Sequence, residues 1–275
     1  MSLQAIDTQD IVPDSLPGAD TTDRDARARA RALLLERTTN ALNGRANQAV
    51  AWLEDCLAAV GETDPLREPR TFDLAFGLAP RRLGRDPLET DQVARERLRR
   101  EAIACLPGWH PQGWRLDEAV RVLLLTAAGD AAVPALLAHT LRHADLPEQL
   151  ALYRALPLFP SDVDMIATVR RGLRTNIRAV FEAIAHDNPW PARHLDEAGW
   201  NQMVLKALFV DSALAPIQGL DDRCNADLAR MLTDYARERF AAGRPIPDEL
   251  RRALGPHATP AAVALLDDER GLAAS

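Results

Sequence analysis

The sequence predicts an all-α protein that forms an α-α superhelix, a HEAT-like stack of about eleven helices in antiparallel pairs. Three observations lead to this fold class. Ala occurs 48 times and Leu 40 times among 275 residues, and both residue types lose little freedom on entering a helix. Val and Ile, which favour strands, together occur only 21 times. Capping and turn residues recur roughly every 15 to 20 residues, and such short connections make successive helices antiparallel neighbours.

Turn residues divide the first half of the chain. Helices are expected over about 23–42, before Asn43-Gly44, and over 45–60, before Gly61. The segment 62–86 carries three prolines and two glycines, so a long ordered loop is expected there. The run DPLE at 86–89 matches a capped helix start with proline in the first turn, and this helix is expected to reach about residue 105. The run PGWHP at 107–111 then breaks it.

The second half shows the same pattern more regularly. Asp130, Asp145, Asn225 and either Thr175 or Asn176 are expected to cap helices, and NPWP at 188–191 is expected to be a break. Helices are expected over 117–128, 130–143, 145–156, 161–172, 175–186, 195–211 and 225–242, and two short ones from Pro247 and Pro260. No strict repeat period is visible, so a compact helical bundle is the competing shape.

Composition limits the function classes. The net charge of −7 argues against a nucleic-acid partner, which would favour a basic chain. No apolar run is long enough for a membrane span, and the polar start does not resemble a secretory signal. Three widely spaced cysteines fit inert thiols in a reducing cytoplasm. Residues 1–22 are expected to form a mobile leader, and 23–275 a single all-helical domain with a candidate sub-boundary at 62–86.

The segment 170–206 is the richest in polar side chains that could recognise a ligand. Trp200, Val204 and Leu208 lie four residues apart and predict an apolar stripe, which places Gln202 and Lys206 on the opposite side of the helix. A second polar cluster follows at 218–225. The predicted ligand-binding residues are Arg170, Arg174, Asn176, Trp190, Asn201, Gln202, Lys206, Asp221 and Arg223.

Lys206 is the one lysine beside 32 arginines. A desolvated lysine can lose its proton and act as a base or nucleophile, whereas arginine cannot. Lys206 is therefore a candidate base, as is His186, although chance or a structural ion pair is the more common reason for a lone lysine. His139 and His143 share a helix face at zinc-ligand spacing, but the glutamate of an HExxH motif is missing and no third ligand is evident. The sequence predicts no metal and no cofactor.

Several stretches in this order resemble a known family. They are PGW at 107–109, LYRALPL at 152–158, GLRTNI at 172–177, VFEAIA at 180–185, NPWPA at 188–192, WNQMVLKALF at 200–209, GLD at 219–221, DYA at 234–236 and ER at 238–239. The sequence is similar to the EboA family over about 25–256, with Trp190 and Phe240 in place of the expected Tyr and Trp and Cys224 in place of Ala. The resemblance implies a cytoplasmic protein that works beside a UbiA-like membrane prenyltransferase and companion proteins of the same gene cluster, and that helps to move or mature a precursor. It supplies no catalytic residues.

Three hypotheses follow. The first is a non-catalytic helical adaptor or carrier that binds a secondary-metabolite precursor, companion proteins or both. The second is a cofactor-independent enzyme acting on that precursor, with Lys206 or His186 as the base and Arg174 as an anion anchor. The third is a purely structural assembly platform, which would present an exposed apolar patch and no pocket.

Overall fold

The computed structural model describes residues 19–43, 47–111, 113–160 and 164–273. Within these ranges the chain forms fourteen α-helices and three short 3-10 helices and no β-strand, which confirms the all-α prediction. The bounds are α1 Ala19–Asn43, α2 Asn47–Glu62, α3 Pro69–Leu83, α4 Gln92–Cys105, α5 Leu116–Ala127, α6 Val133–Thr140, α7 Leu146–Arg154, α8 Ile166–Leu173, α9 Arg178–Ala185, α10 Trp190–His194, α11 Glu197–Phe209, α12 Ala226–Ala241, α13 Leu250–Leu254 and α14 Pro260–Ala273. The 3-10 helices are η1 Asp130–Ala132, η2 Leu156–Leu158 and η3 Gly255–His257.

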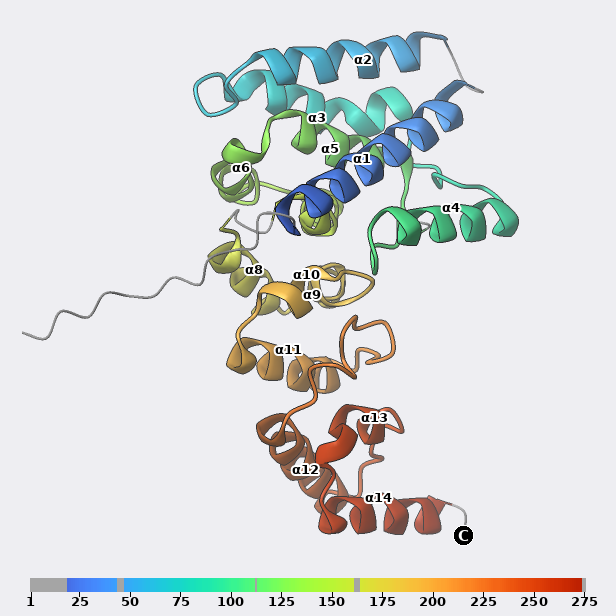
Figure 1. Cartoon of the computed structure of the whole chain (residues 1–275), viewed down its shortest axis with the longest axis vertical. Helices are drawn as coiled ribbons and strands as arrows, with labels where there is room; N and C mark the ends of the chain where they lie inside the picture. The colour runs from blue at the N-terminus through green and yellow to red at the C-terminus, as the bar shows by residue number, and fades with distance from the viewer. Residues whose placement is uncertain (1–18, 44–46, 112, 161–163, 274–275) are drawn as a thin grey trace, which may run out of the picture.

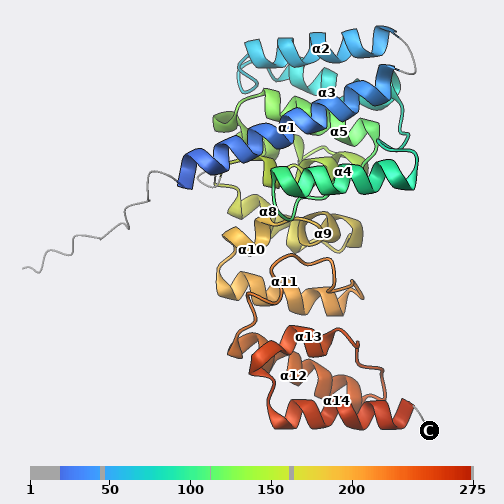
Figure 2. The same cartoon turned by 45° about the vertical axis from the view of Figure 1, so that its right-hand side comes forward.

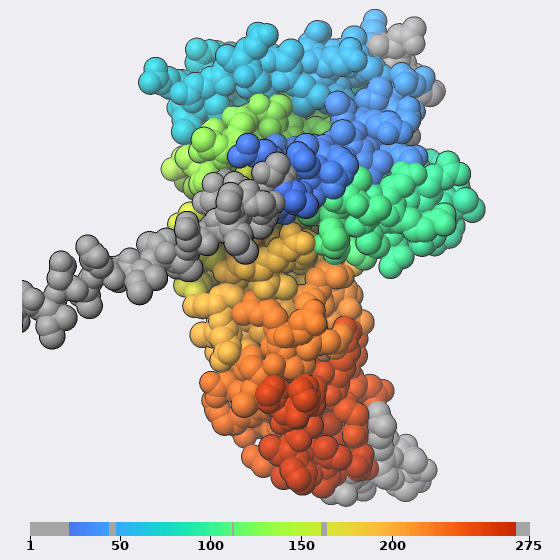
Figure 3. Space-filling model, viewed as in Figure 1, coloured from blue at the N-terminus to red at the C-terminus, as the bar shows by residue number. Residues whose placement is uncertain are grey.

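The helices are arranged in successive layers along the long axis of the molecule, from α2 at one end to α14 at the other (Figures 1 and 2). From α7 onward, helices pack on others that are close to them in the chain: α7 and α8 on α9, α11 on α12, and α12 on α13 and α14. The first layers are less regular because α1 runs across α2, α4 and α5, and Figure 3 shows α1 and α4 side by side on one face. Arg31 fixes this crossing, since its Nη2 donates to the carbonyl of Leu158, 127 positions further along the chain.

The prediction of a loop over 62–86 is wrong, because α3 occupies Pro69–Leu83. Phe72, Phe76 and Leu83 are buried at helical spacing. Pro80 inside this helix cannot donate to the Phe76 carbonyl. The side chain of Arg121 on α5 supplies the missing donor instead, with Nε 3.3 Å from that oxygen. The helix therefore continues through its proline with help from a distant residue.

Three predicted helix starts are also corrected. Asp130 lies inside η1, and α6 begins with Ala132 at its cap position. The DPLE run at 86–89 does not cap α4, which begins at Gln92 with the Asp91 carboxylate accepting from Ala94 N at 2.8 Å. The backbone at 86–88 instead pairs with 114–116, through Leu88 N to Trp114 O at 2.8 Å and Leu116 N to Asp86 O at 2.9 Å. Neither Thr175 nor Asn176 caps α9, since that helix begins two residues later with Ile177 at the cap position.

Other boundaries agree with the sequence more closely. The carboxylate of Asp145 and the amide of Asn225 cap α7 and α12 as predicted, and Asp196 caps α11. The expected break at 188–191 contains the start of the short helix α10. Helix α1 begins at Ala19, so it includes the last residues of the predicted leader. Residues 1–18 of that leader, and 161–163 at the predicted start of a helix, lie outside the described residues.

A buried charge network joins the first layers. Asp117 on α5 is fully buried, and its carboxylate accepts from Arg121 Nη1 at 2.9 Å and from Arg115. Arg121 Nη2 lies 3.3 Å from Glu148 on α7, and Glu118 accepts from Arg154 at 2.6 Å. These contacts fix α7 against α5 and thereby position Arg154.

In the part of the chain that is described, no single helix is long and apolar enough to cross a membrane. The pair Leu116–Ala127 and Asp130–Thr140 passes the length and composition test together, but it is bent by 101°.

Candidate functional site

Helix α11 presents one face to the core and the other to a cleft. Trp200, Val204 and Leu208 are buried, as their spacing predicts. Gln202 and Lys206, one turn apart on the other side, line the cleft with the C-terminal half of α8. The carboxylate of Asp196 starts the helix by accepting from Gly199 N at 2.9 Å.

We call this cavity the α8–α11 cleft, and its volume is about 410 Å³. Three buried apolar side chains form much of its wall, and three cations and one amide complete it. Among the described residues, none of those that line the cleft carries a carboxylate. The lining residues are Arg170, Leu173, Arg174, Leu195, Gly199, Gln202, Met203 and Lys206. Four of the nine predicted ligand-binding residues therefore meet at one cavity.

Lys206 is held at the end of α8. Its Nζ donates to the carbonyl of Leu173, the last residue of that helix, and to the carbonyl of Thr175 at 2.6 Å. Nζ also lies 5.5 Å from the centre of the Phe181 ring. Burial lowers the pKa of the Lys206 ammonium, whereas the two carbonyl dipoles and the ring favour its charged form. Lys206 thus closes α8 and places a cation in the wall of the cleft.

The two arginines of the cleft differ in their partners. Arg170 Nη2 donates to Asp196 Oδ2 at 2.8 Å, and both side chains are exposed. The Gly199 N–H, together with Arg170, lowers the pKa of the Asp196 carboxyl. Arg174 is exposed and has no ion pair among the described residues. Its guanidinium is the group most available to an incoming anion.

The remaining predicted residues lie outside the cleft, and for them ligand binding stays a prediction. Asn176 is exposed in the turn after α8. Trp190 is buried, with its ring centre 4.6 Å from that of His194. The side chains of Asn201 and Asn225 exchange two hydrogen bonds of 3.1 and 2.9 Å, which join α11 to α12.

The two charged residues of the second cluster also contact protein groups. Asp221 accepts two hydrogen bonds of 2.7 Å from Arg252. Arg223 Nη1 donates to the carbonyls of Ala192 and Leu195, at 3.1 and 2.8 Å, and its guanidinium lies 4.8 Å from the ring centre of Trp200. Arg223 therefore positions the segment that leads into α11, which makes it a support of the cleft.

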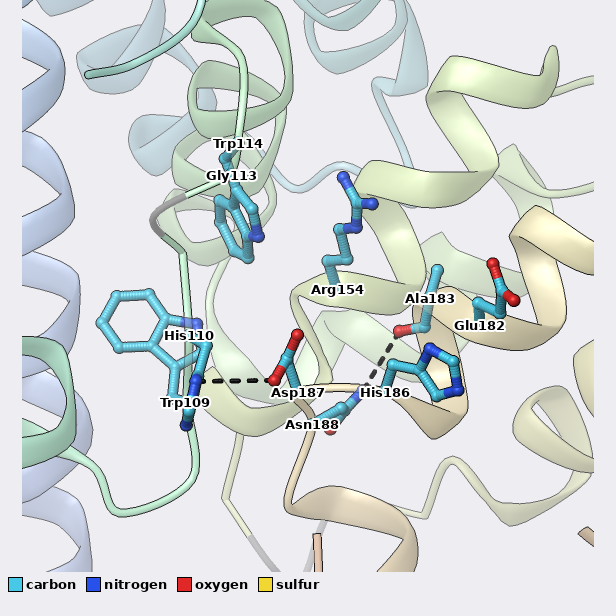
Figure 4. Close-up of a pocket in the computed structure, with 10 residues that line it drawn as sticks. All are labelled: Trp109, His110, Gly113, Trp114, Arg154, Glu182, Ala183, His186, Asp187 and Asn188. Atoms are coloured by element: carbon cyan, nitrogen blue, oxygen red, sulfur yellow. Dashed lines mark hydrogen bonds and ion pairs between the residues drawn. The ribbon is translucent and has the colours of Figure 1, made fainter. Parts of the chain in front are cut away.

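His186, the second candidate base, lies in another cavity of about 280 Å³, which we call the loop pocket (Figure 4). Residues 109–110, 113–114 and 186–188 form it together with side chains of α7 and α9. Sequence reasoning missed most of this pocket. Its signals in the sequence were aromatic residues beside turns and the stretches PGW, LYRALPL, VFEAIA and NPWPA. The lining residues are Trp109, His110, Gly113, Trp114, Arg154, Glu182, Ala183, His186, Asp187 and Asn188.

No group of three or more His, Cys, Asp or Glu side chains that could hold a metal ion occurs among the described residues. His139, of the zinc-like pair, lies 2.8 Å from Arg142 and 3.6 Å from Asp73, and His143 is exposed.

The lowered pKa values of two histidines predict that the stability of the protein depends on pH. Burial lowers the pKa of His110. The charge of Asp187 raises this pKa, and the charge of Arg99 lowers it. Burial also lowers the pKa of His194. The charges of Arg193 and Arg27 lower it further, whereas the charge of Asp23 raises it. Below the ordinary histidine pKa of about 6.5, the unfolded chain takes up protons that the native histidines resist. The free energy of unfolding is therefore expected to fall on acidification from about pH 7.5 to 5.5.

Urea denaturation at each pH measures this effect. His194→Gln should flatten the dependence, while His257→Gln, at an exposed histidine, should leave it unchanged. Equal slopes for wild type and His194→Gln would contradict the assignment of this histidine.

Comparison with known proteins adds one finding. A family model described as "Metabolite traffic protein EboA" matches residues 34–255. Neither the curated proteins nor the solved structures compared with the chain gave a match. The matched range includes both the α8–α11 cleft and the loop pocket.

Proposed function

Because the chain belongs to the EboA family of metabolite traffic proteins, we propose that it binds a small amphipathic anion in the α8–α11 cleft and carries or presents this metabolite without changing it. The observation that carries the proposal is the meeting of Arg170, Arg174, Gln202 and Lys206 at one cavity with an apolar wall. The cavity is of a size typical for small-molecule sites.

The chemistry of the wall sets the ligand class. Leu173, Leu195 and Met203 would take up an apolar portion of the ligand, whose transfer from water is favourable. Arg174 and Lys206 would face the anionic group, and a carboxylate, sulfonate or phosphate would suit the guanidinium of Arg174. Gln202 can donate or accept a hydrogen bond at the rim.

The proposal extends to architecture and setting. We take the layers from α7 onward as degenerate HEAT-like repeats, which is supported by the packing of these helices on others close to them in the chain. The setting is a cytoplasmic one, with companion proteins of the same gene cluster as partners that would receive or deliver the metabolite.

An enzyme acting on the same precursor is the alternative. For Lys206, the two carbonyl acceptors favour the ammonium form, which suits binding of an anion better than removal of a proton. His186 lies in the loop pocket, not in the cleft, so it would act on a different ligand.

Binding of anilinonaphthalene sulfonate, an amphipathic anion whose fluorescence rises in apolar surroundings, tests the proposal. The wild type should bind the probe saturably, and dodecyl phosphate should displace it. Arg174→Glu is expected to weaken binding by about tenfold or more, because an attractive charge beside the anion becomes repulsive.

Arg67→Glu is the matched control, since it makes the same charge change at a side chain that is 86% exposed and lies in the loop before α3. It should leave the affinity unchanged within about twofold. Equal weakening by both variants would show a nonspecific charge effect, and the absence of saturable binding to the wild type would exclude the cleft as a site for amphipathic anions.

A further inference from the structure

The loop pocket has a different chemistry from the cleft. Its side chains come from several separate segments. Figure 4 shows Trp109, His110 and Trp114 on one side and Glu182 and His186 on the other, with Asp187 and Arg154 between them. The two indole rings are edge to face, with centres 6.0 Å apart. Aromatic and polar groups thus surround the same space.

The charges of the pocket are largely neutralised by the protein. Arg154 donates to Glu118 at 2.6 Å, and Glu182 accepts from Arg178 at 2.7 Å and from Ser212 at 2.9 Å. Burial alone would raise the pKa of the Glu182 carboxyl, but these two hydrogen bonds outweigh it and the pKa is lowered. A pocket whose charges already have partners offers little net attraction to an ion.

The histidines retain unused hydrogen-bonding atoms. His186 Nε2 lies 2.9 Å from the carbonyl of Ala213, which can only accept, so in the neutral ring the proton resides on Nε2 and Nδ1 is an acceptor. His110 Nδ1 lies 3.5 Å from Asp187 Oδ1, which leaves Nε2. The buried Nε1 donor of Trp109 has no partner within the described ranges.

The loop that carries Asp187 is held in an unfavourable conformation. Asp187 has a φ of +50°, in a region that non-glycine residues seldom adopt. Its N–H donates to the Pro216 carbonyl at 3.0 Å. Asn188 uses its side chain to fix the loop, with Nδ2 3.4 Å from the Tyr153 and Ala183 carbonyls and Oδ1 accepting from Trp190 N. Such strain is typically retained where a side chain must hold a functional position.

We propose that the loop pocket binds a small, uncharged polyhydroxylated ring, a monosaccharide or a cyclitol. Hydroxyl groups both donate and accept, so they match a wall that offers a donor from Arg154 and acceptors from Glu182, His186 and Asp187. Trp109 and Trp114 also line the cavity and supply it with aromatic carbon, which suits the C–H face of such a ring. A cavity of about 280 Å³ has room for one ring of this kind.

Saturation-transfer NMR with D-glucose, D-ribose and myo-inositol tests the proposal. At least one of these probes should give a saturable signal with the full-length wild type, and its binding should shift the indole N–H resonance of Trp109, assigned with Trp109→Phe. Asp187→Asn keeps the size of the side chain and tolerates the same backbone conformation, but it removes the charged acceptor. It should weaken binding about tenfold.

The matched control is Asp211→Asn, because Asp211 is the other described non-glycine residue with a positive φ, at +57°, and it lies outside the pocket. This variant should bind like the wild type. The relative response to glucose and to inositol distinguishes a sugar from a cyclitol. Absence of saturable binding by all three probes, equal affinity in Asp187→Asn, or displacement by inorganic phosphate would overturn the proposal.

The site is independent of the cleft. Arg174→Glu should therefore keep polyol binding while weakening binding of the sulfonate probe, and Asp187→Asn should weaken polyol binding while keeping binding of the sulfonate probe. If Arg174→Glu removed both ligands, the two cavities would not be separate sites, and the proposal of a second site would be rejected.

Discussion

Replacing Arg121 by alanine is expected to lower the free energy of unfolding by about 3–5 kcal/mol, the range observed when one partner of a buried ion pair is removed. Asp117 is fully buried and Arg121 is 2% exposed, so water cannot replace the lost guanidinium. The substitution also leaves the Phe76 carbonyl without the donor that Pro80 cannot supply. Urea denaturation followed by circular dichroism measures the change.

The control is Arg230→Ala, whose guanidinium is 66% exposed and makes only long contacts of 3.7 and 3.9 Å with Asp227 and Asp234. Its cost should stay below about 1 kcal/mol, as for exposed ion pairs in general. The double variant Asp117→Asn with Arg121→Met should cost less than the sum of its single changes, because it removes both charges of the pair. A loss below about 1 kcal/mol for Arg121→Ala would contradict a stabilising role of the network.

Replacing Trp200 by alanine should cost a similar amount, about 3–5 kcal/mol, for a different reason. The indole of Trp200 is fully buried on the core side of α11. The guanidinium carbon of Arg223 lies 4.8 Å from the centre of its ring. Its Nε1 has no hydrogen-bond partner among the described residues, so the loss is one of packing rather than of a hydrogen bond. The expected signature is a lower denaturation midpoint with an unchanged m-value.

Phe209 on the same helix provides the comparison. Its side chain is 63% exposed and touches Tyr235 edge to face with ring centres 5.2 Å apart. Phe209→Ala should therefore cost about 1 kcal/mol or less. Similar losses for the two variants would mean that burial does not govern the stability of this helix. Because the opposite face of α11 lines the cleft, Trp200→Ala should also weaken binding of the sulfonate probe, whereas Phe209→Ala should leave it intact.

The two proposed sites suggest a division of roles. The α8–α11 cleft combines cations with an apolar wall, while the loop pocket combines neutralised charges with aromatic faces. Arg223 and the Asn201–Asn225 pair hold the segments around α11, and the Glu118–Arg154 contact links the loop pocket to the buried network of α5. A substitution in that network could thus alter the loop pocket without touching it.

The helical class, the Asp145 and Asn225 caps, and the buried stripe of Trp200, Val204 and Leu208 follow from the sequence by itself. These features depend on residue type and on spacings of three or four positions, so the local sequence contains the necessary information. The gathering of Arg170, Arg174, Gln202 and Lys206 is partly of this kind. Helix α8 with its C-cap Arg174 brings the two arginines near one another, and α11 does the same for Gln202 and Lys206.

Only the tertiary structure decided the remainder. A helix passes through Pro80 because Arg121, 41 positions away, donates to the Phe76 carbonyl. The backbone at 86–88 stays extended because it pairs with 114–116. Lys206 gains its partners from the end of α8, and the loop pocket forms where residues 109–110 and 113–114 meet 186–188. Each of these outcomes depends on hydrogen bonds or packing between residues far apart in the chain, and no local pattern of residue types specifies which distant group will satisfy a buried polar atom.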